Sequence, residues 1–236
     1  LESRGIDLER LVVVNVVTIE EFRSKALRAV DIYLKTEEDQ RKPCMFVLDS
    51  LGMLSTEKEI RDALDDKQVR DMTKSQLVKG AFRMLTLKLG QANIPLIVTN
   101  HTYDVIGSYV PTKEMGGGSG LKYAASTIIY LSKAKEKEGT EVVGNIIKAK
   151  TAKSRLSKEN KEVKIRLYYD ERGLDRYYGL LELGELGGLW KNVAGRYEID
   201  GKKVYAKKIL ASPEEYFTDE VMAKLEKIAG ETFSYG

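Results

Sequence analysis

The chain has 236 residues, 42% of them apolar and 32% charged, so it can bury a substantial core in one large domain or in a domain with an appendage. A single cysteine excludes an internal disulfide and indicates a reducing compartment, and with only one histidine the composition argues against a zinc site. The formal net charge of +3 neither requires nor excludes nucleic acid. No apolar run approaches the ~20 residues of a membrane span and no signal peptide is recognisable, so we expect a soluble globular protein without a membrane partner.

The first part of the chain predicts a β-α-β unit. Residues 11–17 are almost all valine and read as a strand, after which Thr18 is placed to cap a helix over residues 19–35. A polar loop then leads to a second strand over residues 43–50. The crossover of such a unit is expected to be right-handed.

The strand over residues 43–50 is the centre of the prediction. Its continuous apolar run, which includes Cys44, is typical of a parallel strand buried on both faces, and Asp49 and Ser50 stand at its carboxyl end. Open α/β sheets bind ligands at that edge, and a carboxylate there can hold the water shell of Mg²⁺ on a nucleoside triphosphate. The alternative interpretation is a polar cap at the end of a strand.

A charged, irregular stretch up to Asp71 precedes a helix over residues 73–91, and a further buried strand over residues 94–100 ends in Asn100 and His101. Two neighbouring strands therefore end in polar residues at one edge of the sheet. The alternation of strands and helices along the chain is typical of a doubly wound sheet.

Residues 101–120 predict no regular element and end in a glycine-rich segment, Gly116–Gly118 and Gly120. These glycines are either a spacer or the start of a helix, where backbone amides can meet an anion.

Strands over residues 127–131, 142–147 and 163–169 are expected to close one side of the sheet. Between residues 133 and 166 there are eleven lysines and arginines but only five glutamates, a segregation of charge that a solvated hairpin would also explain. From Tyr177 a short helix over 179–186, a hairpin over 195–205 and a helix start at Ser212 indicate a small α+β appendage. We therefore expect a core over residues 1–176 and a subdomain over residues 177–236.

Four motifs occur in an order that resembles the RecA family of strand-exchange recombinases, most closely its phage branch, the UvsX recombinases of T4-like phages. They are Leu-Asp-Ser-Leu-Gly-Met-Leu (48–54), Val-Thr-Asn-His-Thr-Tyr (98–103), Met-Gly-Gly-Gly-Ser-Gly-Leu-Lys-Tyr (115–123) and Lys-Ser-Arg (153–155). The resemblance runs from the first residue to about residue 185. It implies an α/β fold with a RecA-like twisted, mainly parallel central sheet flanked by helices, followed by the small α+β appendage.

The resemblance also implies roles at the nucleotide. Asp49 matches the Walker B aspartate that holds Mg²⁺, Ser50 the polar residue beside it, and His101 the switch position that senses the γ-phosphate. Lys153 and Arg155 match two basic residues that reach a neighbouring subunit's nucleotide, in the manner of an arginine finger. As residues two apart on a strand, these two cations are expected to point the same way.

Further matches place residues at the subunit boundary and at DNA. Lys122 and Tyr123 fall at the same boundary as Lys153 and Arg155. Residues 59–72 match the first DNA-binding loop and residues 102–115 the second. The implied DNA-binding residues are Arg83, beside a phosphate, Gly117 and Gly118, whose amides hold phosphate, Tyr103 in the second loop, and the phosphate candidates Lys67, Arg70 and Lys74.

The family implies ATP and Mg²⁺ as cofactors and ATP-dependent strand exchange in a filament on single-stranded DNA. Its implied partners are single- and double-stranded DNA, further copies of the chain, and single-strand-binding and mediator proteins, in the cytoplasm, or the host cytoplasm if a phage encodes the chain. The sequence has no Gly-x-x-x-x-Gly-Lys-Ser/Thr motif, and in the family this Walker A loop and the catalytic glutamate precede the matched part. We therefore expect no ATPase activity from this chain alone. A non-catalytic DNA-binding module and a ring-helicase relative are the alternatives.

Overall fold

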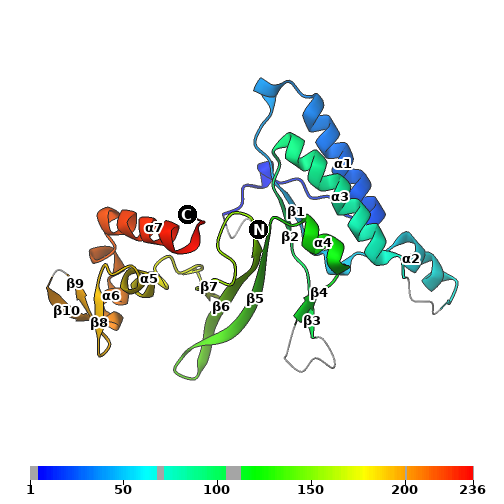
Figure 1. Ribbon diagram of the computed structural model, residues 1–236. Coiled ribbons are helices and arrows are strands. Elements are labelled where there is room, and N and C mark those ends of the chain that lie inside the picture. Colours follow the sequence, from blue (N-terminus) through cyan, green and yellow to red (C-terminus); the bar gives the residue numbers. More distant parts are fainter. Residues whose placement is uncertain (1–4, 68–71, 105–112, 200, 236) are drawn as a thin grey trace. The chain divides into compact units, whose positions relative to one another are not determined.

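The computed structural model describes residues 5–67, 72–104, 113–199 and 201–235 (Figure 1). Contacts divide the chain into two compact units, Leu1–Ala125 and Ser126–Gly236. The domain boundary predicted near residue 176 falls inside the second unit. None of the helices in the described residues is long and apolar enough to cross a membrane.

The first unit combines helices with two small sheets. Its elements in chain order are η2 (Leu8–Arg10), α1 (Ile19–Lys35), η3 (Glu38–Gln40), β1 (Phe46–Leu48), η4 (Leu51–Met53), α2 (Glu57–Leu64), α3 (Lys74–Ala92), β2 (Leu96–Val98), β3 (Thr102–Asp104), β4 (Lys113–Met115) and α4 (Gly118–Ala124).

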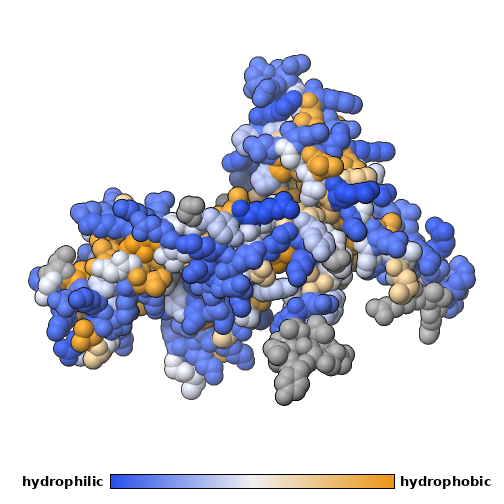
Figure 2. All heavy atoms as spheres, viewed as in Figure 1, coloured by the Kyte–Doolittle hydropathy of each residue, from blue (hydrophilic) through white to orange (hydrophobic). Residues whose placement is uncertain are grey.

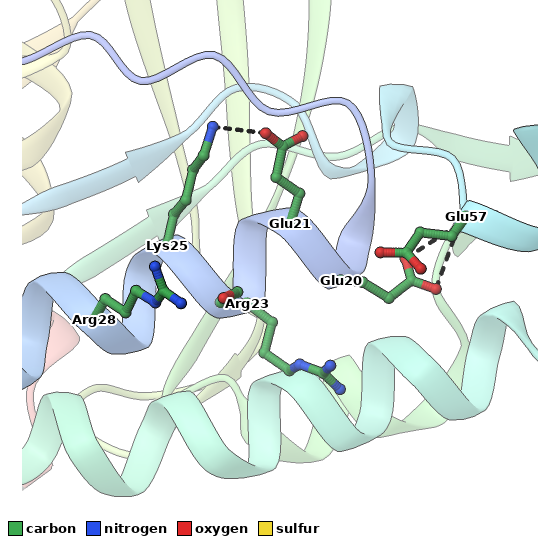
Figure 3. Close-up of a pocket in the computed structure, with 7 residues that line it drawn as sticks. Glu20, Glu21, Arg23, Lys25, Arg28 and Glu57 are labelled. Atoms are coloured by element: carbon green, nitrogen blue, oxygen red, sulfur yellow. Dashed lines mark hydrogen bonds and ion pairs between the residues drawn. The ribbon is translucent and has the colours of Figure 1, made fainter.

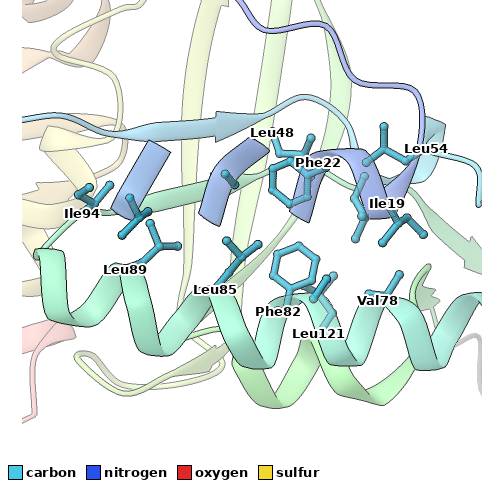
Figure 4. Close-up of a cluster of buried hydrophobic side chains, with 14 of the residues drawn as sticks. Ile19, Phe22, Leu48, Leu54, Val78, Phe82, Leu85, Leu89, Ile94 and Leu121 are labelled. Atoms are coloured by element: carbon cyan, nitrogen blue, oxygen red, sulfur yellow. The ribbon is translucent and has the colours of Figure 1, made fainter. Parts of the chain in front are cut away.

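The predicted helices over residues 19–35 and 73–91 are confirmed as α1 and α3. At the start of α1, Thr18 Oγ1 accepts from Glu21 N at 3.1 Å, and Glu21 Oε2 accepts from Val17 N at 2.9 Å. The first bond satisfies a donor that a helix leaves without a partner at its amino end, and the second ties the residue before the cap to the first turn. The apolar face of α3 packs against α1 in one buried cluster (Figure 4). Its buried members on α1 and α3 include Ile19, Phe22, Val30, Val78, Phe82, Leu85 and Leu89.

β1 and β2 pair in parallel, with Phe46 opposite Leu96 and Leu48 opposite Val98. Phe46 and Leu48 face the core, whereas Val47 between them is 60% exposed, so the prediction of a strand buried on both faces is wrong. Cys44, expected inside that strand, is also exposed. An apolar run reports a tendency to be buried, but burial also needs a covering element, and α1 and α3 cover one face.

The strand predicted over residues 11–17 is also wrong. These residues form no ladder apart from a bridge between Thr18 and Ser55 just beyond them, and Val12 is 84% exposed. The parallel unit is instead β1, the helices α2 and α3, and β2. Hydrophobic residues are accordingly visible at the surface in Figure 2.

Two segments expected to be irregular contain regular elements among their described residues. α2 begins with a capping box in which Thr56 Oγ1 accepts from Glu59 N and Glu59 Oε2 accepts from Thr56 N, both at 2.9 Å. Residues 101–120 supply the antiparallel pair β3 and β4 and then α4. The helix expected to follow the glycines is thus confirmed.

The second unit contains a three-stranded antiparallel sheet and a small α+β cluster. Its elements are β5 (Thr127–Glu138), β6 (Glu141–Ser154), β7 (Glu162–Tyr168), α5 (Leu180–Leu186), β8 (Lys191–Val193), β9 (Arg196–Ile199), β10 (Lys202–Tyr205), α6 (Ala206–Ala211), η5 (Pro213–Glu215) and α7 (Asp219–Phe233). In the sheet of this unit, β6 pairs antiparallel with β5 on one side and with β7 on the other, and the expectation that these strands close one side of the sheet of the first unit stays a prediction.

The short helix and hairpin of the predicted appendage are confirmed, but the helix start at Ser212 is wrong. Only the single turn η5 follows Ser212, and the long helix α7 begins after Thr218, whose Oγ1 accepts from Val221 N. Two Ser/Thr cap signals compete within seven residues, and the second is followed by the apolar spacing of α7. Trp190 anchors this cluster by donating its Nε1 hydrogen to Leu181 O at 2.7 Å.

The core of the first unit gives a direct test of how it is stabilised. Leu85 is fully buried on α3 whereas Leu87 on the same helix is 69% exposed. Leu85→Ala leaves a cavity and should lower the free energy of unfolding by ~2–5 kcal/mol, while Leu87→Ala should change it by less than about 0.5 kcal/mol. Urea unfolding followed through NMR signals of α1 and α3 measures both, and equal losses would contradict the packing described.

Candidate functional site

The carboxyl ends of β1 and β2 meet at one edge of their sheet. Thr99 N donates to Leu48 O and Leu51 N donates to Thr99 O, each at 3.0 Å, so the chain after β2 is held against both sides of Asp49. Thr99 Oγ1 donates to Asp49 Oδ1 at 2.5 Å, and both residues are exposed. The peptide bond between Asp49 and Ser50 is cis.

His101 lies at the same edge, against the backbone that follows Asp49. A Cβ atom added to Gly52 would lie 2.8 Å from His101 Cδ2, so the imidazole occupies the space that a side chain at Gly52 would need. The structure thus brings Asp49 and His101 to a common edge, as the sequence predicts. Their chemical roles stay predictions.

Asn100 fastens the β3–β4 pair to this edge. Its Nδ2 donates to Gly116 O at 2.7 Å, and its Oδ1 accepts from His101 N at 2.9 Å. Gly116 N in turn donates to His101 O at 3.2 Å. Sequence reasoning identified Asn100 only as one of a polar pair and missed this bridging role. The available signal was the residue type, because a side-chain amide at a strand end can both donate and accept a hydrogen bond.

The oxygen atoms at this edge can serve as metal ligands only for an ion that is already bound to another molecule, such as a nucleotide. In the described residues there is no group of three or more His, Cys, Asp or Glu that could hold a metal ion by itself. One exposed carboxylate with neighbouring hydroxyls suits Mg²⁺ bound to phosphates, because that ion keeps most of its waters and takes one or two protein carboxylates.

The predicted DNA-binding residues of the first unit are spread over several elements. Lys67 pairs with Asp65 at 2.8 Å, and Lys74 pairs with Glu59 at 3.1 Å. Arg83 is exposed on α3, and Tyr103 is 60% exposed on β3. Arg70 lies outside the described residues.

Gly117 and Gly118 lead into α4 with φ angles of 91° and 74°. This left-handed backbone favours glycine, which explains the residue type without reference to DNA. A Cβ atom on Gly117 would also come within 3.3 Å of Val78 Cγ1. Phosphate binding by their amides stays a prediction.

The residues predicted at the subunit boundary belong to two units. Lys122 and Tyr123 are exposed on α4, whereas Lys153 lies on β6. β6 ends at Ser154, one residue before Arg155, whose N donates to Ser126 O at 3.0 Å. Arg155 thus directly follows the strand, and the expectation that its side chain points the same way as that of Lys153 stays a prediction.

Part of the basic excess in the second unit is paired within the sheet. Lys148 pairs with Glu162 at 2.9 Å, and Arg166 lies 3.5 Å from both Glu136 and Asp175. Arg166 also stacks over Tyr178 at 4.3 Å from the ring centroid. These contacts support a structural role for these charges.

A shallow depression on the first unit was not anticipated (Figure 3). Charged side chains of both signs from α1 and the start of α2 line it, and the hydrogen bond from Lys25 at 2.6 Å lowers the pKa of Glu21. No predicted site residue lines it; the lining residues are Glu20, Glu21, Arg23, Ser24, Lys25, Arg28 and Glu57.

A family model of the RecA N-terminal domain matches residues 2–175. The chain belongs to the RecA family. It is 36% identical over 198 residues to the recombination and repair protein of Enterobacteria phage T4, covering 84% of this chain and 49% of that protein. It is also 30% identical to protein RecA of Chloroherpeton thalassium, over 68% of this chain and 44% of the relative. The chain thus spans about half the length of these curated relatives.

Membership of the RecA family confirms the resemblance found in the sequence and the predicted α/β fold class. Within the described residues, β1 and β2 form the parallel strand ladder typical of that class.

The contact between Gly52 and the imidazole of this RecA-family chain can be tested by adding a methyl group. Gly52→Ala should displace the His101 ring, because the new Cβ would lie 2.8 Å from Cδ2. The chain has a single histidine, so its imidazole NMR signals report the displacement without ambiguity. Gly90→Ala on α3, where a Cβ meets nothing within 4 Å, is the control, which should leave these signals unchanged and stabilise the helix by about 0.5–1 kcal/mol. Unchanged signals in Gly52→Ala would show that the ring lies elsewhere.

Proposed function

We propose that the chain is part of an ATP-dependent DNA recombinase that forms filaments on single-stranded DNA and catalyses homologous pairing and strand exchange. The observation that carries the proposal is the shared edge at which Asp49, His101 and the Asn100-fastened β3–β4 pair meet, in a chain of the RecA family. Such an edge connects a candidate nucleotide site with a candidate DNA site.

The edge supplies a carboxylate for Mg²⁺ and a residue that can respond to the nucleotide. Asp49, exposed at the end of β1, is the candidate ligand for Mg²⁺, with Ser50 beside it. ATP with its Mg²⁺, when bound, supplies the charged γ-phosphate that the protein senses, and hydrolysis removes that phosphate. His101 is the candidate reader, because its own backbone is hydrogen-bonded to Asn100 and Gly116 at the base of the β3–β4 pair.

The DNA contacts proposed here are to backbone and base faces rather than to base edges. Arg83, Lys67 and Lys74 are cations that suit phosphates, with Arg70 a further candidate outside the described residues. Gly117 and Gly118 offer backbone amides. Tyr103, 60% exposed, offers a ring on which a base can stack. Contacts of these kinds tolerate any sequence, as pairing of arbitrary homologous strands requires.

Further copies of the chain are the proposed partners in a filament. Lys122 and Tyr123, with Lys153 and Arg155, are the candidate boundary residues, the last two contributing positive charge to a neighbour's nucleotide. Double-stranded DNA and single-strand-binding and mediator proteins are further proposed partners, and the proposed location is the cytoplasm, or the host cytoplasm if a phage encodes the chain.

Binding to single-stranded DNA tests the proposed interface on α3. Arg83→Ala should weaken binding of an oligonucleotide and lower the slope of log K against log salt by about 0.7–1, because one phosphate contact is lost. Lys88→Ala on the same helix is the matched control, since Lys88 pairs with Asp31 at 2.9 Å. Fluorescence anisotropy at several salt concentrations measures both variants. Equal affinities and slopes for the two variants would remove α3 from the interface.

The nucleotide half of the proposal predicts the behaviour of this chain by itself. Its sequence contains no Walker A motif, so the backbone cradle and lysine that hold a triphosphate are absent from it, and the purified chain should not hydrolyse ATP. Phosphate release with and without single-stranded DNA measures this, with Asp49→Ala as the comparison. Hydrolysis by the native chain that Asp49→Ala abolishes would overturn the expectation. A non-catalytic DNA-binding module is the second candidate function.

A further inference from the structure

The hydroxyl group of Thr99 bonds to the carboxylate that the preceding section assigns to Mg²⁺. Thr99 Oγ1 donates to Asp49 Oδ1 at 2.5 Å. Neither the motifs nor the polar pair at the end of β2 single out Thr99, and the contact emerges only from the pairing of the two strands.

The bond is built on a held backbone. Thr99 N donates to Leu48 O and Thr99 O accepts from Leu51 N, so the main chain on either side of Asp49 is bonded to one residue. Threonine branches at Cβ and has few accessible χ1 rotamers, which limits where the hydroxyl group can lie. Asp49 by contrast is exposed at the end of a three-residue strand, where an unrestrained carboxylate would sample several rotamers.

We propose that Thr99 is a positioning residue for Asp49. Its hydroxyl group occupies Oδ1 and fixes the side-chain rotamer, so that Oδ2 is the oxygen offered to a water molecule in the shell of a phosphate-bound Mg²⁺. Metal-binding carboxylates are commonly oriented by such a hydrogen bond, and its loss typically costs 10–100-fold in metal affinity or activity. The inference deepens the proposed function and rests on it for the metal. The orientation of Asp49 is independent of that function.

Two substitutions separate positioning from packing. Thr99→Val keeps the β-branched shape and both backbone bonds but removes the hydroxyl group, whereas Thr99→Ser keeps the hydroxyl group and removes the methyl group. Thr127→Val makes the same change at an exposed strand threonine of the second unit and is the control.

The first measurement is the Asp49 rotamer of the full chain, from three-bond NMR couplings about χ1. One rotamer is expected in the native chain, in Thr99→Ser and in Thr127→Val, and averaged couplings in Thr99→Val. Unchanged couplings in Thr99→Val would overturn the proposal whatever the fate of the proposed function.

The second measurement is the affinity for Mn²⁺–ATP, a paramagnetic probe that reports even weak binding through broadening of the Asp49 and Ser50 signals. Thr99→Val should weaken it about tenfold, the low end of the range because the bond is exposed, and Thr99→Ser should restore it. Averaged couplings with unaltered affinity would overturn the metal role of Thr99. Absence of broadening in the native chain would contradict the nucleotide site of the proposed function and the metal role together, while the couplings would still decide whether Thr99 orients Asp49.

Discussion

The parallel register of β1 and β2 is the constraint on which the rest of the site depends. Leu48 opposite Val98 makes Asp49 and Thr99 the first residues beyond the ladder, and the bonds from Thr99 to Leu48 and Leu51 extend the pairing past the end of the strands. Because side chains alternate along a strand, a slip of one residue would turn Thr99 away from Asp49 and exchange the core and exposed faces. The register therefore fixes both the packing and the chemistry.

That register is maintained mainly by the helices. A two-stranded sheet is marginally stable alone, and each strand here has three residues. Phe46, Leu48, Leu96 and Val98 pack on the cluster formed by α1 and α3, while Val47 and Ile97 between them are largely exposed. The stabilising apolar contacts thus lie on one face of the sheet. The polar edge belongs to a two-stranded sheet that α1 and α3 hold in place.

The parts of this fold that the sequence predicts are those determined locally. Thr18 with its following acidic turn and the apolar spacing of α3 are contained within one helix each, and the strand ends of Asp49 and Asn100 follow from short apolar runs. The failures are of another kind. Residues 11–17 have the composition of a strand but no partner ladder, and Ser212 competes with Thr218 for one helix start. Thr99 illustrates the same limit, since its bond to Asp49 joins residues fifty apart in sequence.

Three consecutive residues after β2 each make a different contact at the edge of the sheet. Thr99 bonds back across the sheet to Asp49, Asn100 bonds forward to Gly116, and His101 lies against Gly52. Because they are joined by adjacent peptide bonds, a shift of one changes the geometry available to the other two. Asn100 bonds to the backbone on both flanks of the β3–β4 pair, through His101 N and Gly116 O, so the base of that pair has few ways to move independently of the edge. Coupling between a nucleotide at Asp49 and a strand of DNA at the β3–β4 pair would then need no long chain of intermediates, only two arrangements of residues 99–101 that the two ligands favour unequally.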